Sequence, residues 1–245
     1  MTRDILRIAM WSGPRNISTA MMRAFGNRAD TQVIDEPFYA AWLARSGADH
    51  PMREAVLAAQ PTDPARVAAI LLGPVPAGKS VFYQKHMAHH MTPDMDPGWM
   101  ASCRHAFLIR PPHEVLASYT KRRQSVTLAE IGIVQQVELF DRVARAHGHA
   151  PPVLAADDVL ANPEATLTRL CAALGLGFDP AMLTWPAGPR ETDGVWAPVW
   201  YDAVAASTGF ARPGPPIDKN SLTQDLRALA DQAEPYYARL AAHRI

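Results

Sequence analysis

The sequence begins with polar residues that could bind an anion, placed where an apolar run gives way to a helical pattern. The run is broken at Gly13-Pro14, and the first turn of the expected helix follows. Backbone N–H groups at a helix N-terminus have no partners within the helix and lie at its positive end, so they attract phosphate or sulfate. Arg15 adds a permanent charge with paired donors, and Ser18 and Thr19 add hydroxyl groups. We interpret this stretch as an anion cradle in preference to a simple helix cap.

Three later apolar runs also end in residues that could bind or react. Glu36 follows the second run, His86 ends the third, and Arg110 ends the fourth. If these runs are parallel strands, their carboxyl ends meet at one edge of the sheet, which is where α/β proteins bind ligands. We therefore expect Glu36, His86 and Arg110 to gather with Arg15 around one site.

The elements that must position these residues alternate along the chain. The expected strands cover 4–12, 31–38, 80–86, 105–110 and 152–156. The expected helices cover 16–27, three segments within 39–72, a segment from about 113, 128–147, 163–175 and 222–242. This order predicts the α/β class: a parallel sheet of about five strands with helices on both faces.

Residues 178–220, called the late segment below, differ from the rest in composition. They are rich in proline and glycine and contain Trp185, Trp196, Trp200 and Tyr201. These aromatic side chains favour packing in the core or in a lid, where several could cap a substrate pocket. We expect one domain over 1–245, with the late segment as an irregular lid and 222–242 as a C-terminal helix.

Composition excludes several classes of partner. The formal net charge is zero, so no overall field attracts nucleic acid or a membrane surface. No apolar run approaches membrane-spanning length, and the first strand starts too early to leave room for a signal peptide. Cys103 and Cys171 lie in apolar settings typical of reduced core residues. We expect a cytoplasmic protein whose partner is a small molecule; its oligomeric state is not readable from the sequence.

Two further patterns invite interpretations that we reject. Residues 73–80 match the Walker A pattern letter for letter, but that loop needs a strand before it and a helix after it, and here the order is reversed. Pro74 and Pro76 also lack the N–H groups that a phosphate cradle needs. The histidines at 86, 89 and 90 have no cysteine or His-Glu-x-x-His arrangement beside them, so we expect them to line a substrate pocket and expect no metal.

Taken together, several segments resemble the sulfotransferase family, which transfers a sulfuryl group from 3′-phosphoadenosine 5′-phosphosulfate (PAPS). Residues 13–19 are similar to that family's phosphosulfate loop, 110–118 to its 3′-phosphate segment, and 84–87 to its strand-end histidine region. Residues 157–174 match its acidic, proline and leucine pattern. The opening through Phe38 is similar to a bacterial sulfotransferase-like subgroup that is also fused to plant branched-chain aminotransferase-like proteins.

The resemblance implies a P-loop NTPase-like fold and PAPS as the donor, with adenosine 3′,5′-bisphosphate as its product and no metal. The donor-binding residues that it implies are Arg15, Asn16, Ile17, Ser18, Thr19, Arg110, Ser118 and Arg212. Ile17 stands where the family has glycine, and the segment around Arg212 has proline where the family has lysine.

Sulfuryl transfer also needs a base to take the acceptor's proton. His86 is one candidate, because an unperturbed imidazole titrates at about pH 6.5. Glu36 is the other if burial raises its pKa, and trehalose sulfotransferases use a glutamate at a similar position. The alternative role for His86 is a hydrogen-bonded core histidine. The alternative for Glu36 is a helix cap or an ion pair with Arg15 or Arg110. Lys85 should point to the face opposite His86, so it ranks as a second-line charge-stabilising residue.

Two other functions remain open at this point. One is a small-molecule kinase or other nucleotide phosphotransferase on the same scaffold, although the first loop lacks the Lys-Ser/Thr ending that binds a magnesium nucleotide. The other is a non-catalytic anion- or nucleotide-binding protein, which Ile17 in the loop favours. For Arg110, the simple alternative is a strand-end ion pair. The sequence does not identify the acceptor.

Overall fold

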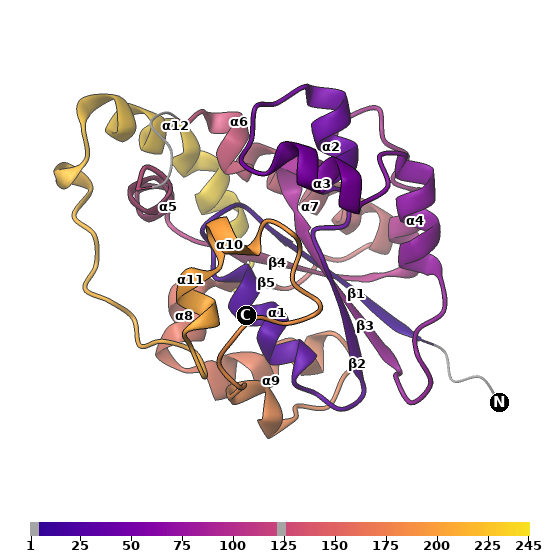
Figure 1. The fold of residues 1–245 in the computed structure, drawn as a ribbon. Coiled ribbons are helices and arrows are strands. Elements are labelled where there is room, and N and C mark those ends of the chain that lie inside the picture. The colour runs from indigo at the N-terminus through magenta and orange to yellow at the C-terminus, as the bar shows by residue number, and fades with distance from the viewer. Residues whose placement is uncertain (1–4, 122–125) are drawn as a thin grey trace.

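The computed structural model, which describes residues 5–121 and 126–245, is built around a five-stranded parallel sheet (Figure 1). The strands are β1 (Leu6–Ser12), β2 (Thr31–Asp35), β3 (Val81–Met87), β4 (Arg104–Ile109) and β5 (Val153–Ala155). Their order is β2-β3-β1-β4-β5, and each neighbouring pair is parallel. The predicted α/β class is confirmed. Because β1 lies at the centre, the loop that leaves it runs between the ends of β3 and β4.

Helices cover both faces of the sheet because side chains of successive strand residues point to opposite faces. Ile8 and Met10 of β1 pack against α1 (Ser18–Gly26) and α9 (Pro163–Ala173). Ala9 and Trp11 belong to the core on the other face, which includes residues of the helices α4 (Pro64–Leu72), α5 (Pro112–Tyr119), α7 (Ile133–His147) and α12 (Gln224–Ala241). The nucleus of the fold is therefore two apolar layers separated by the sheet.

Shorter elements connect these layers. They are α2 (Tyr39–Ser46), α3 (Arg53–Ala59), η1 (Ala88–His90), η2 (Gly98–Ser102), α6 (Leu128–Ile131), α8 (Ala156–Ala161), η3 (Pro180–Leu183), α10 (Ala197–Trp200), α11 (Asp202–Ala205) and η4 (Lys219–Ser221). Residues 73–80, which match the Walker A pattern, connect α4 to β3. A helix therefore precedes this segment and a strand follows it, as we expected, whereas a phosphate-binding loop needs the opposite order.

The prediction of a single helix over 128–147 was wrong, because the helix is interrupted at Gly132. This glycine has φ of 70°, in the left-handed region, and it separates α6 from α7. A Cβ atom at this position would lie 3.3 Å from Nδ1 of His89. The break therefore reflects a close approach between distant segments that the apolar periodicity of the sequence does not record.

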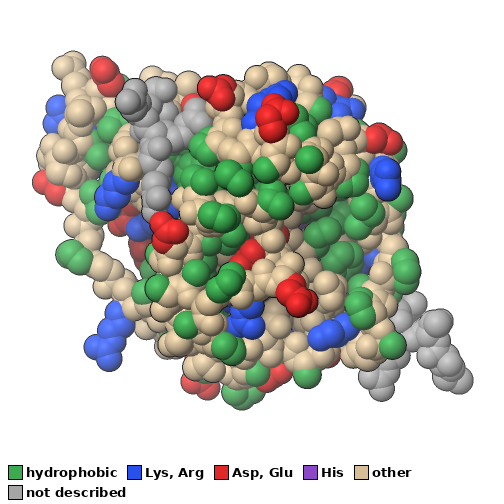
Figure 2. Space-filling model, viewed as in Figure 1, with side chains coloured by type: hydrophobic (Ala, Val, Ile, Leu, Met, Phe, Trp, Pro, Cys, Tyr) green, Lys and Arg blue, Asp and Glu red, His purple; other side chains and the backbone are tan. Residues whose placement is uncertain are grey.

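In the late segment, α10 and α11 lie in front of the sheet, across α1 and the start of the loop after β1 (Figure 1). On the face shown in Figure 2, acidic and basic side chains are scattered among apolar ones, consistent with zero net charge. Of the helices in the described part of the chain, none has both the length and the apolar character that crossing a bilayer requires.

Candidate functional site

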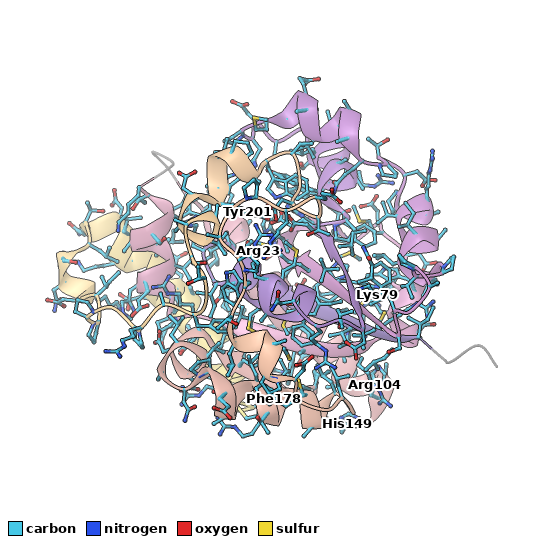
Figure 3. The ribbon with its side chains drawn as sticks, turned by 60° about the horizontal axis from the view of Figure 1, so that its bottom comes forward. Arg23, Lys79, Arg104, His149, Phe178 and Tyr201 are labelled. Carbon is cyan, nitrogen blue, oxygen red and sulfur yellow. The ribbon has the colours of Figure 1, made fainter. Side chains whose placement is uncertain are left out.

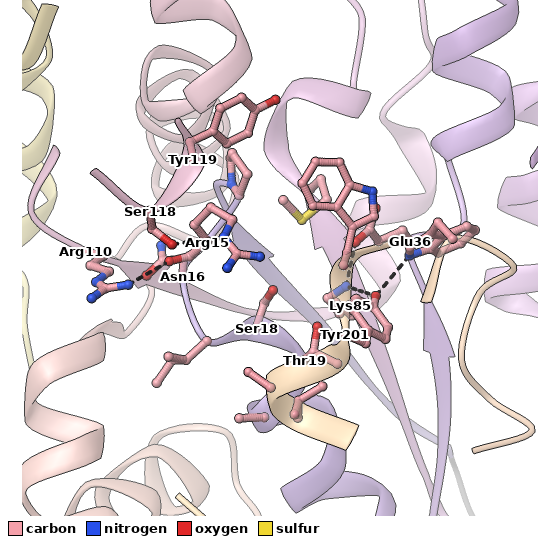
Figure 4. A pocket seen from close by; sticks show the side chains of 18 of the residues that line it. Arg15, Asn16, Ser18, Thr19, Glu36, Lys85, Arg110, Ser118, Tyr119 and Tyr201 are labelled. Atoms are coloured by element: carbon pink, nitrogen blue, oxygen red, sulfur yellow. Dashed lines mark hydrogen bonds and ion pairs between the residues drawn. The ribbon is translucent and has the colours of Figure 1, made fainter. Parts of the chain in front are cut away.

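A cavity of about 310 Å³ opens at the carboxyl edge of the sheet (Figure 4). It lies between the loop after β1, the ends of β2 and β3, the C-terminal end of α5, and the late segment. The predicted site residues that line it are Arg15, Asn16, Ile17, Ser18, Thr19, Glu36, Lys85, Arg110 and Ser118. His86 and Arg212 do not line it.

The loop after β1 has an uncommon backbone. Arg15 has φ of 58° and Ile17 has φ of 47°, both in the left-handed region that non-glycine residues seldom adopt. Ile17 is also the N-cap of α1, and its own side chain forms no capping hydrogen bond. Loops that alternate in this way direct successive N–H groups into one concavity, and such concavities bind anions. The backbone of residues 15–19 therefore has the conformation of loops that bind anions.

Two neighbouring residues fix the position of this loop. Gly13 is required there, because a Cβ atom would lie only 2.4 Å from the carbonyl oxygen of Ile131. Asn16 is buried and donates from Nδ2 to the carbonyl oxygen of Leu108, at 2.6 Å, which ties the loop to β4. The Ile17 side chain packs on the core formed with α1 and α9, so its methyl groups belong to that core.

The two segments predicted to bind the donor are in direct contact. Arg15 Nε donates to Ser118 Oγ at 3.0 Å, and Arg110 Nη1 donates to the carbonyl oxygen of Arg15 at 3.1 Å. Arg110 Nε also forms an ion pair with Glu114, 2.9 Å away on α5. Arg110 thus forms the strand-end ion pair that we considered as its alternative role, and it also binds the loop after β1. A guanidinium group has five N–H donors, so these two contacts do not exhaust it.

A second cluster lies on the other side of the cavity. Lys85 Nζ donates to Glu36 Oε1 at 2.6 Å and to the Tyr201 hydroxyl at 2.7 Å (Figure 4). It also donates to Asp35 Oδ1 at 2.8 Å. The Lys85 side chain is 1% exposed. Glu36 has φ of 40°, another left-handed non-glycine residue. Strained backbone of this kind is concentrated at functional sites, and here it turns the carboxylate toward the cavity.

The charges of this cluster depend on one another. Burial raises the pKa of Glu36, the Lys85 ammonium opposes that rise, and the Asp35 carboxylate adds to it. Burial alone lowers the pKa of Lys85, but the Asp35 and Glu36 carboxylates reverse this and hold it well above its ordinary value. Lys85 is therefore a fixed cation, and Glu36 is a carboxylate that accepts a proton more readily than an exposed one.

His86 was predicted to face the site and Lys85 to face away, and the structure shows the reverse. β3 continues to Met87, so the two side chains do point to opposite faces, but the cavity is on the Lys85 side. His86 is 2% exposed, stacks on Trp11 at 4.5 Å between ring centroids, and hydrogen-bonds Gln84. Burial lowers its pKa to about 3. The core-histidine alternative describes its position.

Arg212 was predicted to bind the donor, but the structure does not place it at the cavity. Its neighbour Ala211 lines the cavity, whereas Arg212 is exposed and does not line it.

Aromatic rings form the cavity wall next to Glu36. His89 and His90 line it as we expected, together with Tyr39, Trp196 and Trp200. The buried His90 ring stacks on Tyr39 at 4.6 Å. Its Nδ1 has no hydrogen-bond partner among the described residues and lies 4.0 Å from Glu36 Oε2. Burial and neighbouring basic groups lower the pKa of His90 well below its ordinary value, so this ring is neutral.

Three contributors to the site were missed. Asp35 was not among the candidate residues, and no sequence pattern indicates that it shares Lys85 with Glu36. Tyr201 was considered only for core or lid packing or as a cap on a substrate pocket, although its hydroxyl contacts Lys85 and Asp35. Tyr39 was not singled out, and only its position three residues after Glu36 in the sequence could have indicated that it lies at the site. Within residues 5–121 and 126–245, no group of three or more His, Cys, Asp or Glu side chains is arranged to hold a metal ion.

Comparison with known proteins places this geometry in a family. The sulfotransferase domain family matches residues 6–244. The chain is 36% identical over 208 residues to branched-chain-amino-acid aminotransferase-like protein 2 of Arabidopsis thaliana, and 37% identical over 207 residues to protein 1 of the same name. Each match covers 84% of this chain but only 36% and 37%, respectively, of the much longer plant proteins.

Solved structures share the fold at low sequence identity. The sulfotransferase domain of the Synechococcus PCC 7002 olefin synthase is 20% identical, with a TM-score of 0.53 over 94% of this chain and 95% of that one. A sulfotransferase from Alicyclobacillus acidocaldarius is 13% identical, with a TM-score of 0.56 over 98% and 96%. Since the family match extends over nearly the whole sequence, this chain belongs to the sulfotransferase domain family.

Proposed function

We propose that this protein transfers a sulfuryl group from PAPS to a hydroxyl or amine group of a small acceptor. The observation that carries the proposal is the contact between Arg15 and Ser118. It places a helix N-terminus suited to the 5′-phosphosulfate and a second polar segment suited to the 3′-phosphate in one cavity, with a buried carboxylate across from them. PAPS carries anionic groups at both of its ends.

On the donor side, the N–H groups of residues 17–19 and the Arg15 guanidinium would hold the 5′-phosphosulfate. Arg110 and Ser118 would hold the 3′-phosphate. As in phosphoryl transfer, such groups chiefly position the reactants and stabilise the charge that develops on the leaving oxygens. Loss of one preorganised donor typically raises the barrier by about 2.7–4 kcal/mol.

On the acceptor side, we assign Glu36 as the base. The acceptor oxygen or nitrogen attacks sulfur in line, the new bond to sulfur forms, and the bond from sulfur to the bridging phosphate oxygen breaks. Adenosine 3′,5′-bisphosphate leaves with that electron pair, and the acceptor's proton passes to Glu36 Oε2, since Oε1 is bound to Lys85. Glu36 then returns the proton to solvent, and the sulfated acceptor leaves.

The structure favours a positioning role for Lys85 over direct contact with the sulfuryl group. An ammonium group has three N–H donors, and Asp35, Glu36 and Tyr201 occupy all three. Lys85 therefore orients Glu36 and limits how far its pKa rises.

The gap between Glu36 and His90 fits an acceptor hydroxyl. An oxygen at about 2.8 Å from both Glu36 Oε2 and His90 Nδ1 spans their 4.0 Å separation. It would donate to the carboxylate and accept from the imidazole in its Nδ1–H tautomer. The buried, unpartnered nitrogen of His90 thereby gains the partner that such atoms normally have.

Transfer of sulfur-35 from labelled PAPS to a panel of phenols, alcohols and amines tests the proposal. Labelled ATP with magnesium ions serves as the matched control for a phosphotransferase. We expect a labelled product from PAPS and none from ATP. A labelled product from ATP alone would reject the sulfotransferase assignment.

A further inference from the structure

The Tyr201 hydroxyl lies at the centre of the buried network behind Glu36. It accepts hydrogen bonds from Lys85 Nζ at 2.7 Å and from Trp196 Nε1 at 3.0 Å, and it donates to Asp35 Oδ2 at 2.7 Å. We propose that Tyr201 is a positioning residue that sets the geometry of the Lys85–Glu36 pair and hence the basicity of Glu36. The proposal rests on the proposed function for what Glu36 does in the reaction.

The hydrogen-bond count shows why the network has one arrangement. The Tyr201 oxygen has two lone pairs and one hydrogen, and the three contacts use all of them. The Lys85 ammonium likewise uses each of its three hydrogens. Tyr201 is 6% exposed and Lys85 is 1% exposed, so water does not readily replace a missing partner. In a buried network that is fully satisfied, removal of one member forces the others to rearrange.

Tyr201 comes from the late segment, and other contacts fasten that segment at the same place. The Gly194 N–H donates to Asp35 Oδ2 at 3.1 Å, so Asp35 is bonded twice by residues that follow it by more than a hundred positions. Asp193 forms an ion pair of 2.7 Å with Arg23 of α1, and both side chains are buried. Figure 3 shows Arg23 and Tyr201 close together near the middle of that view.

The local backbone is shaped to deliver Tyr201. A Cβ atom at Gly194 would lie 2.1 Å from the Trp196 ring, so only glycine allows the chain to fold back over this indole. The buried Trp196 in turn donates to the Tyr201 oxygen. Residues 193–201 therefore form part of the catalytic architecture and do more than cover the cavity.

The expected consequence for Glu36 follows from competition for Lys85. The charged or titratable groups that face Glu36 are Lys85 of β3, Asp35 of β2, His90 of η1 and Tyr201. Without the tyrosine hydroxyl, Asp35 loses a donor and draws Lys85 toward itself. Glu36 Oε1 then loses part of its ion pair, and neutral His90 supplies no compensating charge. The pKa of Glu36 should rise.

The test compares Tyr201→Phe with Tyr83→Phe. Tyr83 is also fully buried and lies on β3 two residues before Lys85, but within the part of the chain that the structure describes its hydroxyl has no hydrogen-bond partner. Both substitutions remove one buried hydroxyl oxygen from the same region, and only one of them breaks the network. Carbon-13 NMR of protein labelled at glutamate carboxyl carbons gives the pKa of Glu36, with Glu36→Gln to assign its signal. Calorimetry with adenosine 3′,5′-bisphosphate reports the donor site separately.

We expect Tyr201→Phe to raise the pKa of Glu36 by about one, which is a tenfold loss of the basic form at a pH below both values. Tyr83→Phe should leave that pKa unchanged, and both variants should bind the bisphosphate within about twofold of the unsubstituted protein. An equal Glu36 pKa in the two variants would overturn the proposal. If Tyr201→Phe does not fold, Trp196→Phe removes the N–H that holds the Tyr201 oxygen and should shift the pKa in the same direction; no shift would likewise overturn it.

The proposed function and the positioning role of Tyr201 fail on different results. If the unsubstituted protein does not bind the bisphosphate, the proposed function is wrong, while the Glu36 titrations still decide whether Tyr201 controls this carboxylate. If the bisphosphate binds and Tyr201→Phe leaves the pKa of Glu36 unchanged, the proposed function stands and the positioning role of Tyr201 is wrong.

Discussion

Arg15 Nε donates a hydrogen bond to Ser118 Oγ at 3.0 Å, although 103 positions separate the two residues in the sequence. The contact joins the loop after the central strand to the helix after its neighbour. Each residue lies in a segment suited to one end of a nucleotide with two anionic ends. The proposed donor site is therefore assembled from two segments that only the fold brings together.

The first prediction concerns the two arginines of the donor site. Arg15→Ala and Arg110→Ala should each weaken binding of adenosine 3′,5′-bisphosphate by about tenfold or more, because a hydrogen bond to a charged group contributes roughly 1.5–3 kcal/mol. Calorimetry measures the change. Lys79→Ala is the control: Lys79 belongs to the Walker-like letters, but it does not line the cavity and donates to the carbonyl oxygen of Ala29. Unaltered affinity in both arginine variants would contradict the site.

The second prediction separates the two candidate bases. Glu36→Gln should lower kcat by about 10²–10⁴, the usual contribution of a general base, and leave bisphosphate affinity nearly unchanged. His86→Phe should keep most of its activity, since the His86 ring stacks on Trp11 outside the cavity. Steady-state kinetics with the best acceptor of the panel compares them. Loss of turnover in a folded His86→Phe protein, with full activity in Glu36→Gln, would return the role of base to the histidine.

A third prediction follows from the buried histidines and concerns stability against pH. Burial lowers the pKa of His86 to about 3 and that of His105 to about 4. The unfolded chain takes up these protons at about pH 6.5, whereas the folded protein does so only near the lowered values. Stability should therefore be greatest above pH 6.5 and fall as the pH drops toward 3–4, by about 1.4 kcal/mol per pH unit for each such histidine.

Urea unfolding at a series of pH values checks this slope. His86→Phe removes one of the protons involved, so its curve between pH 4 and 6 should be shallower by about 1.4 kcal/mol per pH unit. Parallel curves for the two proteins would show that His86 is not held neutral by burial.

The fourth prediction concerns the buried ion pair that fastens the late segment. Asp193→Ala leaves Arg23, a side chain only 3% exposed, without its charged partner, and should lower the free energy of unfolding by about 3–5 kcal/mol. The control is Asp231→Ala, which breaks an exposed pair with Lys219 and should cost at most about 1 kcal/mol. Denaturant titration compares the two, and equal effects would argue against a fastening role for Asp193.

Much of the fold follows from local pattern. The strand-to-helix transition at Gly13-Pro14 and the alternation of apolar runs with helical segments identify the sheet and its ligand-binding edge. The helix break at Gly132 was not predictable, because its cause is the approach of His89 from another part of the chain. Apolar periodicity indicates which face of a helix is buried, but it does not indicate where another segment of the chain approaches the helix closely.

The site was predictable to the level of segments and less so to the level of atoms. Alternation along β3 correctly separated Lys85 from His86, but nothing local says which face of the strand meets the cavity. The role of Tyr201 depends on two charged partners more than a hundred positions away, Lys85 and Asp35, as well as on the nearby Trp196. Such a network leaves no spacing pattern to detect.

The most direct test of the central claim is a crystal structure of the protein with adenosine 3′,5′-bisphosphate. We predict that the 5′-phosphate accepts hydrogen bonds from the backbone N–H groups of residues 17–19 and from Arg15, with the 3′-phosphate between Arg110 and Ser118. A bisphosphate bound elsewhere, or bound in this cavity with its two ends exchanged, would contradict the account.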